Sequence, residues 1–170
     1  MLFSCEYLVH NSVYKKFFIY IHIVFLLIAN KMQMHSDQHN LDLSGKTIAV
    51  VDDDLATIRY FEILLKTTSA EVITFLNGTD FINYVKTHPK SFDLVMMDYL
   101  IPFVNGIECV KSLRKFNRHV PVVMITAYYT RESKEESILA GSNEYILKPV
   151  IPERVLSILE KYLTRKEYAY

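Results

Sequence analysis

The chain has 170 residues, of which 51% are apolar and 22% charged, a balance typical of one globular domain with a short appendage. Its 19 basic and 19 acidic side chains cancel, so the composition gives no indication of nucleic-acid binding, which usually accompanies a basic excess. The cysteines, Cys5 and Cys109, and the six histidines have no metal-ligand spacing, so any metal is expected on carboxylates.

Residues 1–45 differ in composition from the rest of the chain. An apolar run interrupted by one histidine covers residues 17–29, and a polar stretch typical of a linker covers 33–44. The run is shorter than the roughly 20 residues that cross a bilayer, and no small-residue cleavage site follows it. Three interpretations remain: a marginal membrane anchor, a helix buried against another surface, or translated sequence upstream of a natural start at Met32 or Met34. The last is favoured, and it places residues 1–45 outside the native domain.

From residue 46 to about residue 165, short β-branched runs alternate with amphipathic segments, which predicts the folded domain there. The runs predicted as strands are Thr47–Val51, Val72–Leu76, Leu94–Met97, Val122–Ile125 and Tyr145–Leu147. The segments predicted as helices are Thr57–Lys66, Thr79–Lys86, Gly106–Phe116, Ser133–Ala140 and Pro152–Leu163. Consecutive parallel strands need right-handed crossovers, so this alternation predicts a parallel sheet covered by helices on both faces.

Polar side chains follow four of the predicted strands. They are Asp52, Asp53 and Asp54 after the first, Asp98 after the third, Thr126 after the fourth and Lys148 after the fifth. Ligands of an open parallel sheet bind at the carboxyl ends of its strands, so these side chains are expected to meet there. Asp54 is a candidate helix N-cap, but a purely structural explanation is much harder to sustain for all four strand ends together.

The residue types at these strand ends are those that phosphoryl transfer requires. Clustered carboxylates repel one another, and a divalent cation such as Mg²⁺ relieves that repulsion so that a phosphoryl group can approach Asp98. Lys148 can pair with Asp98 or with a phosphoryl oxygen, and Thr126 offers a hydroxyl donor. Phosphoryl transfer depends mainly on positioning and charge neutralisation, and a carboxylate nucleophile would yield an aspartyl phosphate.

Over residues 46–163 the chain resembles the receiver domain of bacterial response regulators. The motifs that carry the resemblance are V-V-D-D at 50–53, M-M-D-Y-L-I-P-F-V-N-G at 96–106, V-M-I-T-A at 123–127 and Y-I-L-K-P at 145–149. The resemblance implies a flavodoxin-like α/β fold, a doubly wound five-stranded parallel sheet flanked by five helices. It also implies a phosphoacceptor module of a two-component phosphorelay, which catalyses its own phosphorylation and dephosphorylation but is not a turnover enzyme.

The resemblance assigns roles to individual residues. Asp98 would be phosphorylated, with Thr126 and Lys148 as its catalytic partners. Mg²⁺ would be held by Asp53, Asp98 and the main-chain carbonyl of Leu100, and by Asp52, often through water. Thr126 and Tyr145 would form the switch, and the last two helices with the strand between them would form the responsive face. Pro102 and Gly106 would shape the loop after the acceptor.

The resemblance also implies partners. The phosphoryl donor would be a histidine kinase or a histidine phosphotransfer protein, and the output would pass to an unknown protein by direct contact rather than to nucleic acid. The expected location is cytoplasmic, or the cytoplasmic face of the inner membrane if residues 17–29 are a true anchor. Membrane contact is expected only in that second case.

Two alternatives concern the identity of the module. L-D-L-S-G-K-T-I at 41–48 resembles the linker before the last receiver of hybrid sensor kinases, so the chain could be a detached relay module. Asp52 and Asp54 also form the D-x-D of haloacid-dehalogenase-type phosphatases. That family needs a further acidic pair after the lysine, which makes this alternative the weaker one.

Two side chains depart from the common receiver pattern. Leu100 is apolar where many members have a polar side chain near the hydrolytic water, and Tyr128 is bulky where it could shield the phosphoryl group. Neutral variation within the family is the favoured interpretation. The competing hypothesis is a long-lived phosphate on Asp98, which equal dephosphorylation rates of the wild type and Leu100→Asn would contradict.

Overall fold

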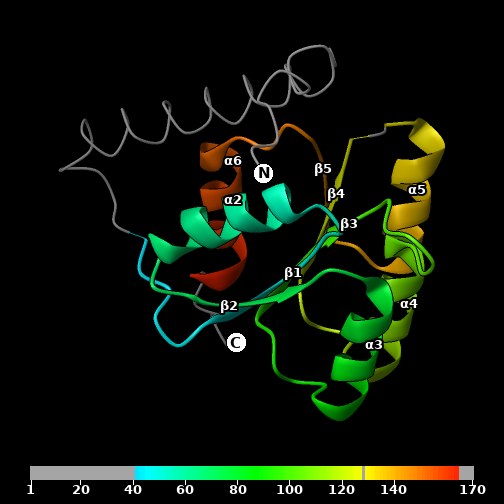
Figure 1. Cartoon of the computed structure of the whole chain (residues 1–170), viewed down its shortest axis with the longest axis horizontal. Helices are drawn as coiled ribbons and strands as arrows, with labels where there is room; N and C mark the ends of the chain where they lie inside the picture. Colours follow the sequence, from blue (N-terminus) through cyan, green and yellow to red (C-terminus); the bar gives the residue numbers. More distant parts are fainter. Residues whose placement is uncertain (1–40, 128, 165–170) are drawn as a thin grey trace, which may run out of the picture. The chain divides into compact units, whose positions relative to one another are not determined.

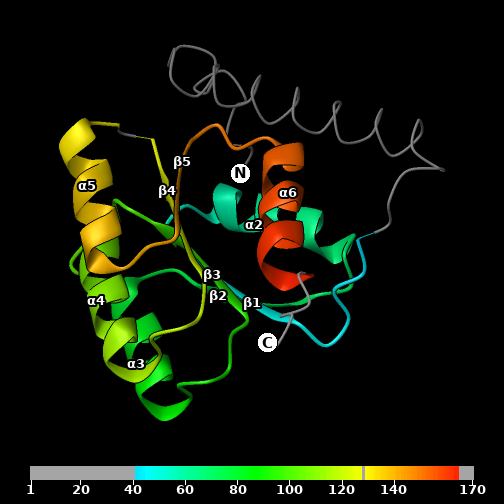
Figure 2. The same cartoon turned by 180° about the vertical axis from the view of Figure 1, so that it is seen from behind.

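The computed structural model describes residues 41–127 and 129–164, which form one parallel five-stranded sheet in the order β2-β1-β3-β4-β5 with five helices (Figures 1 and 2). The strands are β1 (Thr47–Val51), β2 (Glu71–Phe75), β3 (Leu94–Asp98), β4 (Val122–Thr126) and β5 (Glu144–Leu147). The helices are α2 (Leu55–Lys66), α3 (Gly78–Thr87), α4 (Gly106–Phe116), α5 (Arg131–Ala140) and α6 (Pro152–Leu163). The predicted doubly wound α/β fold is therefore confirmed.

The sheet separates two hydrophobic cores, with α2 and α6 on one face and α3, α4 and α5 on the other (Figure 1). Successive side chains of β3 point to opposite faces, as the two-residue period of a strand requires. Val95 and Met97 pack on the α3 side, while Leu94 and Met96 pack on the α2 side. Because both faces are covered, the central strands β1, β3 and β4 are buried at nearly every position, which explains their continuous hydrophobic runs.

Three helices begin one or two residues before their predicted first residues, because the residue that precedes each helix caps it. The side chain of Asp54 accepts a hydrogen bond from the main-chain N–H of Ala56, and α2 begins at Leu55. Asn77 and Thr130 cap α3 and α5 in the same way, which satisfies amide groups that the first turn of a helix leaves unpaired. The apolar periodicity alone had indicated only the packed part of each helix.

Leu43 belongs to the core although it lies in the stretch predicted as a linker. Its side chain is 2% exposed and packs in the core beneath α2 and α6. Its main-chain N–H donates to the carbonyl oxygen of Thr68 at 2.7 Å, which fixes the chain before β1 against the end of α2. The packed residues therefore begin before Lys46.

The apolar run at 17–29 and the candidate starts Met32 and Met34 lie outside the described residues, so their interpretation remains a prediction. Among the helices between residues 41 and 164, none has the length and apolar character needed to span a bilayer. The domain limits 1–45 and 46–165 also remain predictions.

Candidate functional site

The parallel sheet brings three carboxylates together at the carboxyl ends of its central strands. Asp52 and Asp53 directly follow β1, and Asp98 is the last residue of the neighbouring strand β3. One carboxylate oxygen from each of the three lies within 4.8 Å of the others. Asp52 and Asp98 are 2% and 5% exposed, whereas Asp53 is exposed. The site thus has two buried acids and one acid that solvent reaches.

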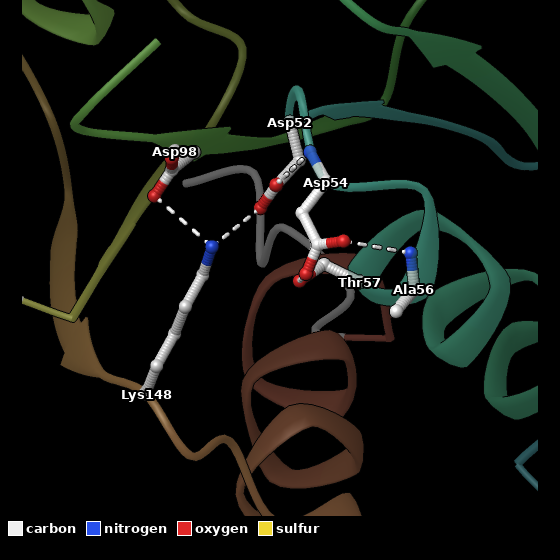
Figure 3. Close-up of polar contacts among 6 residues, drawn as sticks. All are labelled: Asp52, Asp54, Ala56, Thr57, Asp98 and Lys148. Atoms are coloured by element: carbon white, nitrogen blue, oxygen red, sulfur yellow. Dashed lines mark hydrogen bonds and ion pairs between the residues drawn. The ribbon is translucent and has the colours of Figure 1, made fainter. Parts of the chain in front are cut away.

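Lys148 lies between the two buried acids (Figure 3). Its ammonium group is 2.7 Å from Oδ2 of Asp52 and 3.3 Å from Oδ1 of Asp98. The main-chain N–H of Lys148 donates to the carbonyl oxygen of Thr126 at 2.7 Å, which anchors the lysine beside the end of β4. The sequence predicted a pairing with Asp98, and the structure adds Asp52 as the nearer partner.

The charges of the site do not balance. Three carboxylates and one ammonium group leave an excess of two negative charges when all are ionised. Burial raises the pKa of Asp98 to about 6, and the negative charge of Asp52 adds to this rise while Lys148 opposes it. Burial also raises the pKa of Asp52, despite its hydrogen bond with Lys148.

The ammonium group of Lys148 is held in its charged form. Burial favours the neutral amine, but the hydrogen bond and the negative charge of Asp52, followed by those of Asp98, outweigh burial and raise the pKa of Lys148. The lysine therefore provides a fixed positive charge, and the remaining excess of two negative charges matches the charge of a divalent cation. Oxygen donors alone, at this separation, are the ligand set that Mg²⁺ prefers.

The turn after β1 orients Asp52 and assigns a separate task to Asp54. The main-chain N–H of Asp54 donates to Oδ1 of Asp52 at 3.0 Å, which leaves Oδ2 of Asp52 for Lys148 (Figure 3). The carboxylate of Asp54 accepts from the N–H of Ala56 at 3.0 Å and from the hydroxyl of Thr57 at 3.1 Å. Asp54 is thus the N-cap of α2, as its sequence position suggested.

The loop after Asp98 is held close by Gly106, the first residue of α4. A Cβ atom on Gly106 would lie 2.1 Å from the main-chain oxygen of Asp98, so only glycine fits without displacing the strand end. The N–H of Gly106 also donates to the carbonyl oxygen of Tyr99 at 3.1 Å. The sequence assigned Gly106 to the shape of the loop, but its contact with the acceptor residue itself could not be read from spacing.

Thr126 and Leu100 lie where the strand order predicts them. Thr126 ends β4, the strand next to β3, and is fully buried. Leu100 follows Asp98 by two residues, and its side chain is 55% exposed. The expected contacts of the Thr126 hydroxyl with a phosphoryl group and of the Leu100 carbonyl with a metal remain predictions.

Tyr145 is half-buried in β5, where it contacts Ser133 in α5 and Tyr129 in the loop before α5. Its hydroxyl is 2.8 Å from the hydroxyl of Ser133, and its ring packs edge-on against Tyr129 with centroids 6.1 Å apart. Ser133 also closes a capping box with Thr130 at the start of α5. The sequence missed Ser133, although the T-x-x-S pattern was its available signal. Tyr128 lies outside the described residues.

Comparison with known proteins identifies the family. The family model of the response regulator receiver domain matches residues 48–160, about two thirds of the 170 residues. The chain belongs to this family. Receiver domains are signalling modules of two-component systems rather than turnover enzymes, and they bind Mg²⁺ at an acidic site such as the aspartate cluster described above. This match favours the receiver over the phosphatase alternative.

Two curated relatives illustrate the settings in which such a domain occurs. The polar-differentiation response regulator DivK of Brucella anthropi is 29% identical over 120 residues, which cover 69% of this chain and 96% of that protein. The hybrid signal transduction histidine kinase M of Dictyostelium discoideum is 31% identical over 125 residues, which cover 71% of this chain but only 5% of the kinase. The chain therefore resembles both a free-standing regulator and one module of a much longer protein.

Solved structures support the same fold. A CheY-like response regulator receiver domain protein from Methanospirillum hungatei JF-1 has a TM-score of 0.66 at 27% identity, covering 70% of this chain and 94% of that one. The receiver domain of a sensor histidine kinase from Pseudomonas aeruginosa PAO1 has a TM-score of 0.64 at 22% identity, covering 72% of this chain and 100% of that one. That second structure has a magnesium ion coordinated in its active site cleft.

Proposed function

We propose that this receiver accepts a phosphoryl group on Asp98 from a histidine kinase or a histidine phosphotransfer protein. The observation that carries the proposal is the placement of Asp98, buried at the end of β3 within reach of Asp52, Asp53 and Lys148. A carboxylate oxygen of Asp98 attacks phosphorus as the phosphorus–nitrogen bond of the donor histidine breaks, and the electron pair of that bond leaves with the imidazole.

Each neighbouring group has a separate part in this transfer. Asp52, Asp53 and Asp98 would hold Mg²⁺ together with the carbonyl of Leu100, and the bound ion would neutralise the carboxylates and the phosphoryl oxygens. Lys148 exchanges one of its aspartate partners for a phosphoryl oxygen. The Thr126 hydroxyl donates to another such oxygen. All of these groups lie at strand ends of one rigid sheet, which supports positioning as the source of catalysis.

The phosphorylated state would be transmitted through Tyr145. Movement of Thr126 toward the phosphoryl group would leave space that the Tyr145 ring can fill, because β4 and β5 are neighbours in the sheet. The hydrogen bond between Tyr145 and Ser133 would then break, which couples the site to the start of α5. The face formed by α5, β5 and α6 would meet a downstream protein in the cytoplasm.

A second candidate is a relay module within a hybrid sensor kinase. The match to one small part of the Dictyostelium kinase supports it, as does the 41–48 segment that resembles a hybrid-kinase linker. Both candidates use the same chemistry at Asp98. They differ in output, because a relay module passes its phosphoryl group on to a histidine protein, whereas a free-standing regulator acts through its surface.

The direct test is phosphorylation by acetyl phosphate, followed by intact mass measurement. With Mg²⁺ present, the wild-type chain is expected to gain the mass of one phosphoryl group, and Asp98→Asn is expected to gain none. Addition of EDTA should abolish the gain in the wild type. A wild-type chain that gains no mass with Mg²⁺ present, or an Asp98→Asn variant that still gains it, would contradict the proposal.

A further inference from the structure

The second half of α4 and the loop after it carry four cations and no acid. Residues 111–119 read K-S-L-R-K-F-N-R-H, with four lysines or arginines and neither aspartate nor glutamate, in a chain whose 19 basic and 19 acidic side chains cancel overall. Lys111, Arg114, Lys115 and Arg118 line a hollow of about 530 Å³ together with Gly141 and Asn143. We call these four cations the α4 basic face.

Arg114 forms the fixed part of this face. Its guanidinium donates to the carbonyl oxygen of Gly141 from Nε at 3.0 Å and from Nη2 at 2.7 Å, and to the carbonyl oxygen of Asn117 from Nη1 at 3.1 Å. A Cβ atom on Gly141 would lie 2.9 Å from Nε, so the side chain of Arg114 packs closely against this glycine at the end of α5. These acceptors are neutral, so the positive charge of Arg114 stays uncompensated.

The other three cations also lack acidic partners. Within residues 41–127 and 129–164, Lys111, Arg114, Lys115 and Arg118 form no ion pair. The negative end of the α4 dipole stabilises the positive charges of Arg114 and Lys115, which lie in the last turn of the helix. It does not stabilise the charge of Lys111, which lies one turn earlier, or that of Arg118, which lies beyond the helix. Net positive charge therefore remains on the hollow.

The α4 basic face lies away from the phosphoacceptor. Helix α4 begins at Gly106, against the main chain of Asp98, and a helix rises about 1.5 Å per residue, so Lys115 is roughly 13 Å further along its axis. In Figures 1 and 2, α4 lies beside α5 on the face of the sheet opposite α2 and α6. A molecule on this face would leave the access to Asp98 open.

We propose that the α4 basic face binds an acidic segment of a partner protein. From Lys111 to Lys115 the helix rises by about 6 Å, which matches carboxylates three or four residues apart on a helix. The donors of Arg114 are bound to main-chain and amide oxygens, so Arg114 acts on a bound segment through its charge, while the exposed Lys111, Lys115 and Arg118 pair directly with carboxylates. Four cations are fewer than the roughly 6–10 phosphate contacts of many nucleic-acid binders.

The test measures binding of a fluorescein-labelled peptide of eight glutamates by fluorescence anisotropy. Reversal of two charges, Lys115→Glu with Arg118→Glu, is expected to weaken binding by about tenfold or more at low salt, because each lost attraction also becomes a repulsion. The matched control is Lys66→Glu with Lys86→Glu, which makes the same change in net charge on exposed lysines in the last turns of α2 and α3. This control should weaken binding by less than about twofold, since distant exposed charges are screened by salt.

Three outcomes would overturn the proposal. They are equal loss of binding in the two double variants, no measurable binding by the wild type at low salt, and tighter binding of a single-stranded DNA of equal charge that is lost in Lys115→Glu with Arg118→Glu. The last result would assign the face to nucleic acid. Phosphorylation of Asp98 by acetyl phosphate should be the same in all variants, which separates this inference from the proposed function and confirms that each variant is folded.

Discussion

The ionisation of Asp98 is governed by its surroundings rather than by its residue type. A solvent-exposed aspartate is ionised throughout the neutral range, but burial beside Asp52 gives Asp98 a pKa of about 6. Lys148 is the opposing influence, and it divides its attraction between two carboxylates. The metal-free site is therefore under electrostatic strain, and the strain can be measured by removing one charge at a time.

Removal of the Asp98 charge is expected to stabilise the metal-free protein at neutral pH. Since the pKa rises from its usual value of 3.8 to about 6 on folding, the ionised carboxylate costs stability that is gained back as the pH falls. The upper limit of this cost is roughly 3 kcal/mol, and Asp98→Asn should recover about 1–2 kcal/mol at pH 7 in EDTA. Urea unfolding measures the difference in the free energy of unfolding between Asp98→Asn and the wild type, and this difference should vanish near pH 4. An equal difference at pH 7 and pH 4 would contradict the claim that the ionised Asp98 destabilises the fold.

Removal of the Lys148 charge should have the opposite effect. Lys148→Met leaves two buried carboxylates without a counter-charge, and loss of one partner of a buried pair costs about 3 kcal/mol or more. Asp98→Asn in the same chain should restore part of that loss, so a double-mutant cycle would give a non-zero coupling energy. Strictly additive effects of the two substitutions would mean that Lys148 does not act on Asp98.

At the scale of single elements, the start of α4 fixes the acceptor strand. Alanine favours a helix by up to about 1 kcal/mol over glycine, so Gly106→Ala would stabilise α4 if space allowed. The added Cβ would lie 2.1 Å from the oxygen of Asp98, and overpacking of this kind costs about 1–3 kcal/mol. The clash should prevail.

Gly106→Ala is therefore expected to lower the free energy of unfolding and to slow phosphorylation by acetyl phosphate. Ser112→Ala, in the same helix, is a suitable control because it adds no atom near Asp98. Both variants should be compared by urea unfolding and by the rate of mass gain. A higher free energy of unfolding in Gly106→Ala would contradict this prediction, because the loop after Asp98 would then move aside without destabilising the fold.

At the scale of the whole molecule, the folded unit depends on residues before the first strand. Leu43 fills the core beneath α2 and α6, so a chain that begins at Lys46 should be less stable than one that begins at Asn40. Loss of a buried leucine side chain costs about 2–5 kcal/mol. Leu43→Ala in the longer chain should account for most of the difference measured by urea unfolding. Equal stability of the two chains would place the domain limit at Lys46.

The sequence by itself determined the order of strands and helices, because apolar runs and helical periodicity survive in a linear pattern. It also determined which residues stand at the strand ends, since Asp52, Asp98, Thr126 and Lys148 each follow an apolar run directly. Parallel strands end at one edge of the sheet, so this convergence could be inferred without coordinates. The family match supports the same inference.

Only the tertiary structure decided which of these side chains meet, and which residues outside the motifs support them. The nearer partner of Lys148 is Asp52 rather than Asp98, because the turn at Asp54 aims one Asp52 oxygen at the ammonium group. The fit of Gly106 against Asp98 and the bond between Ser133 and Tyr145 likewise join residues whose spacing carries no signal. Distances and hydrogen-bond directions depend on the packing of whole elements, which a linear pattern does not record.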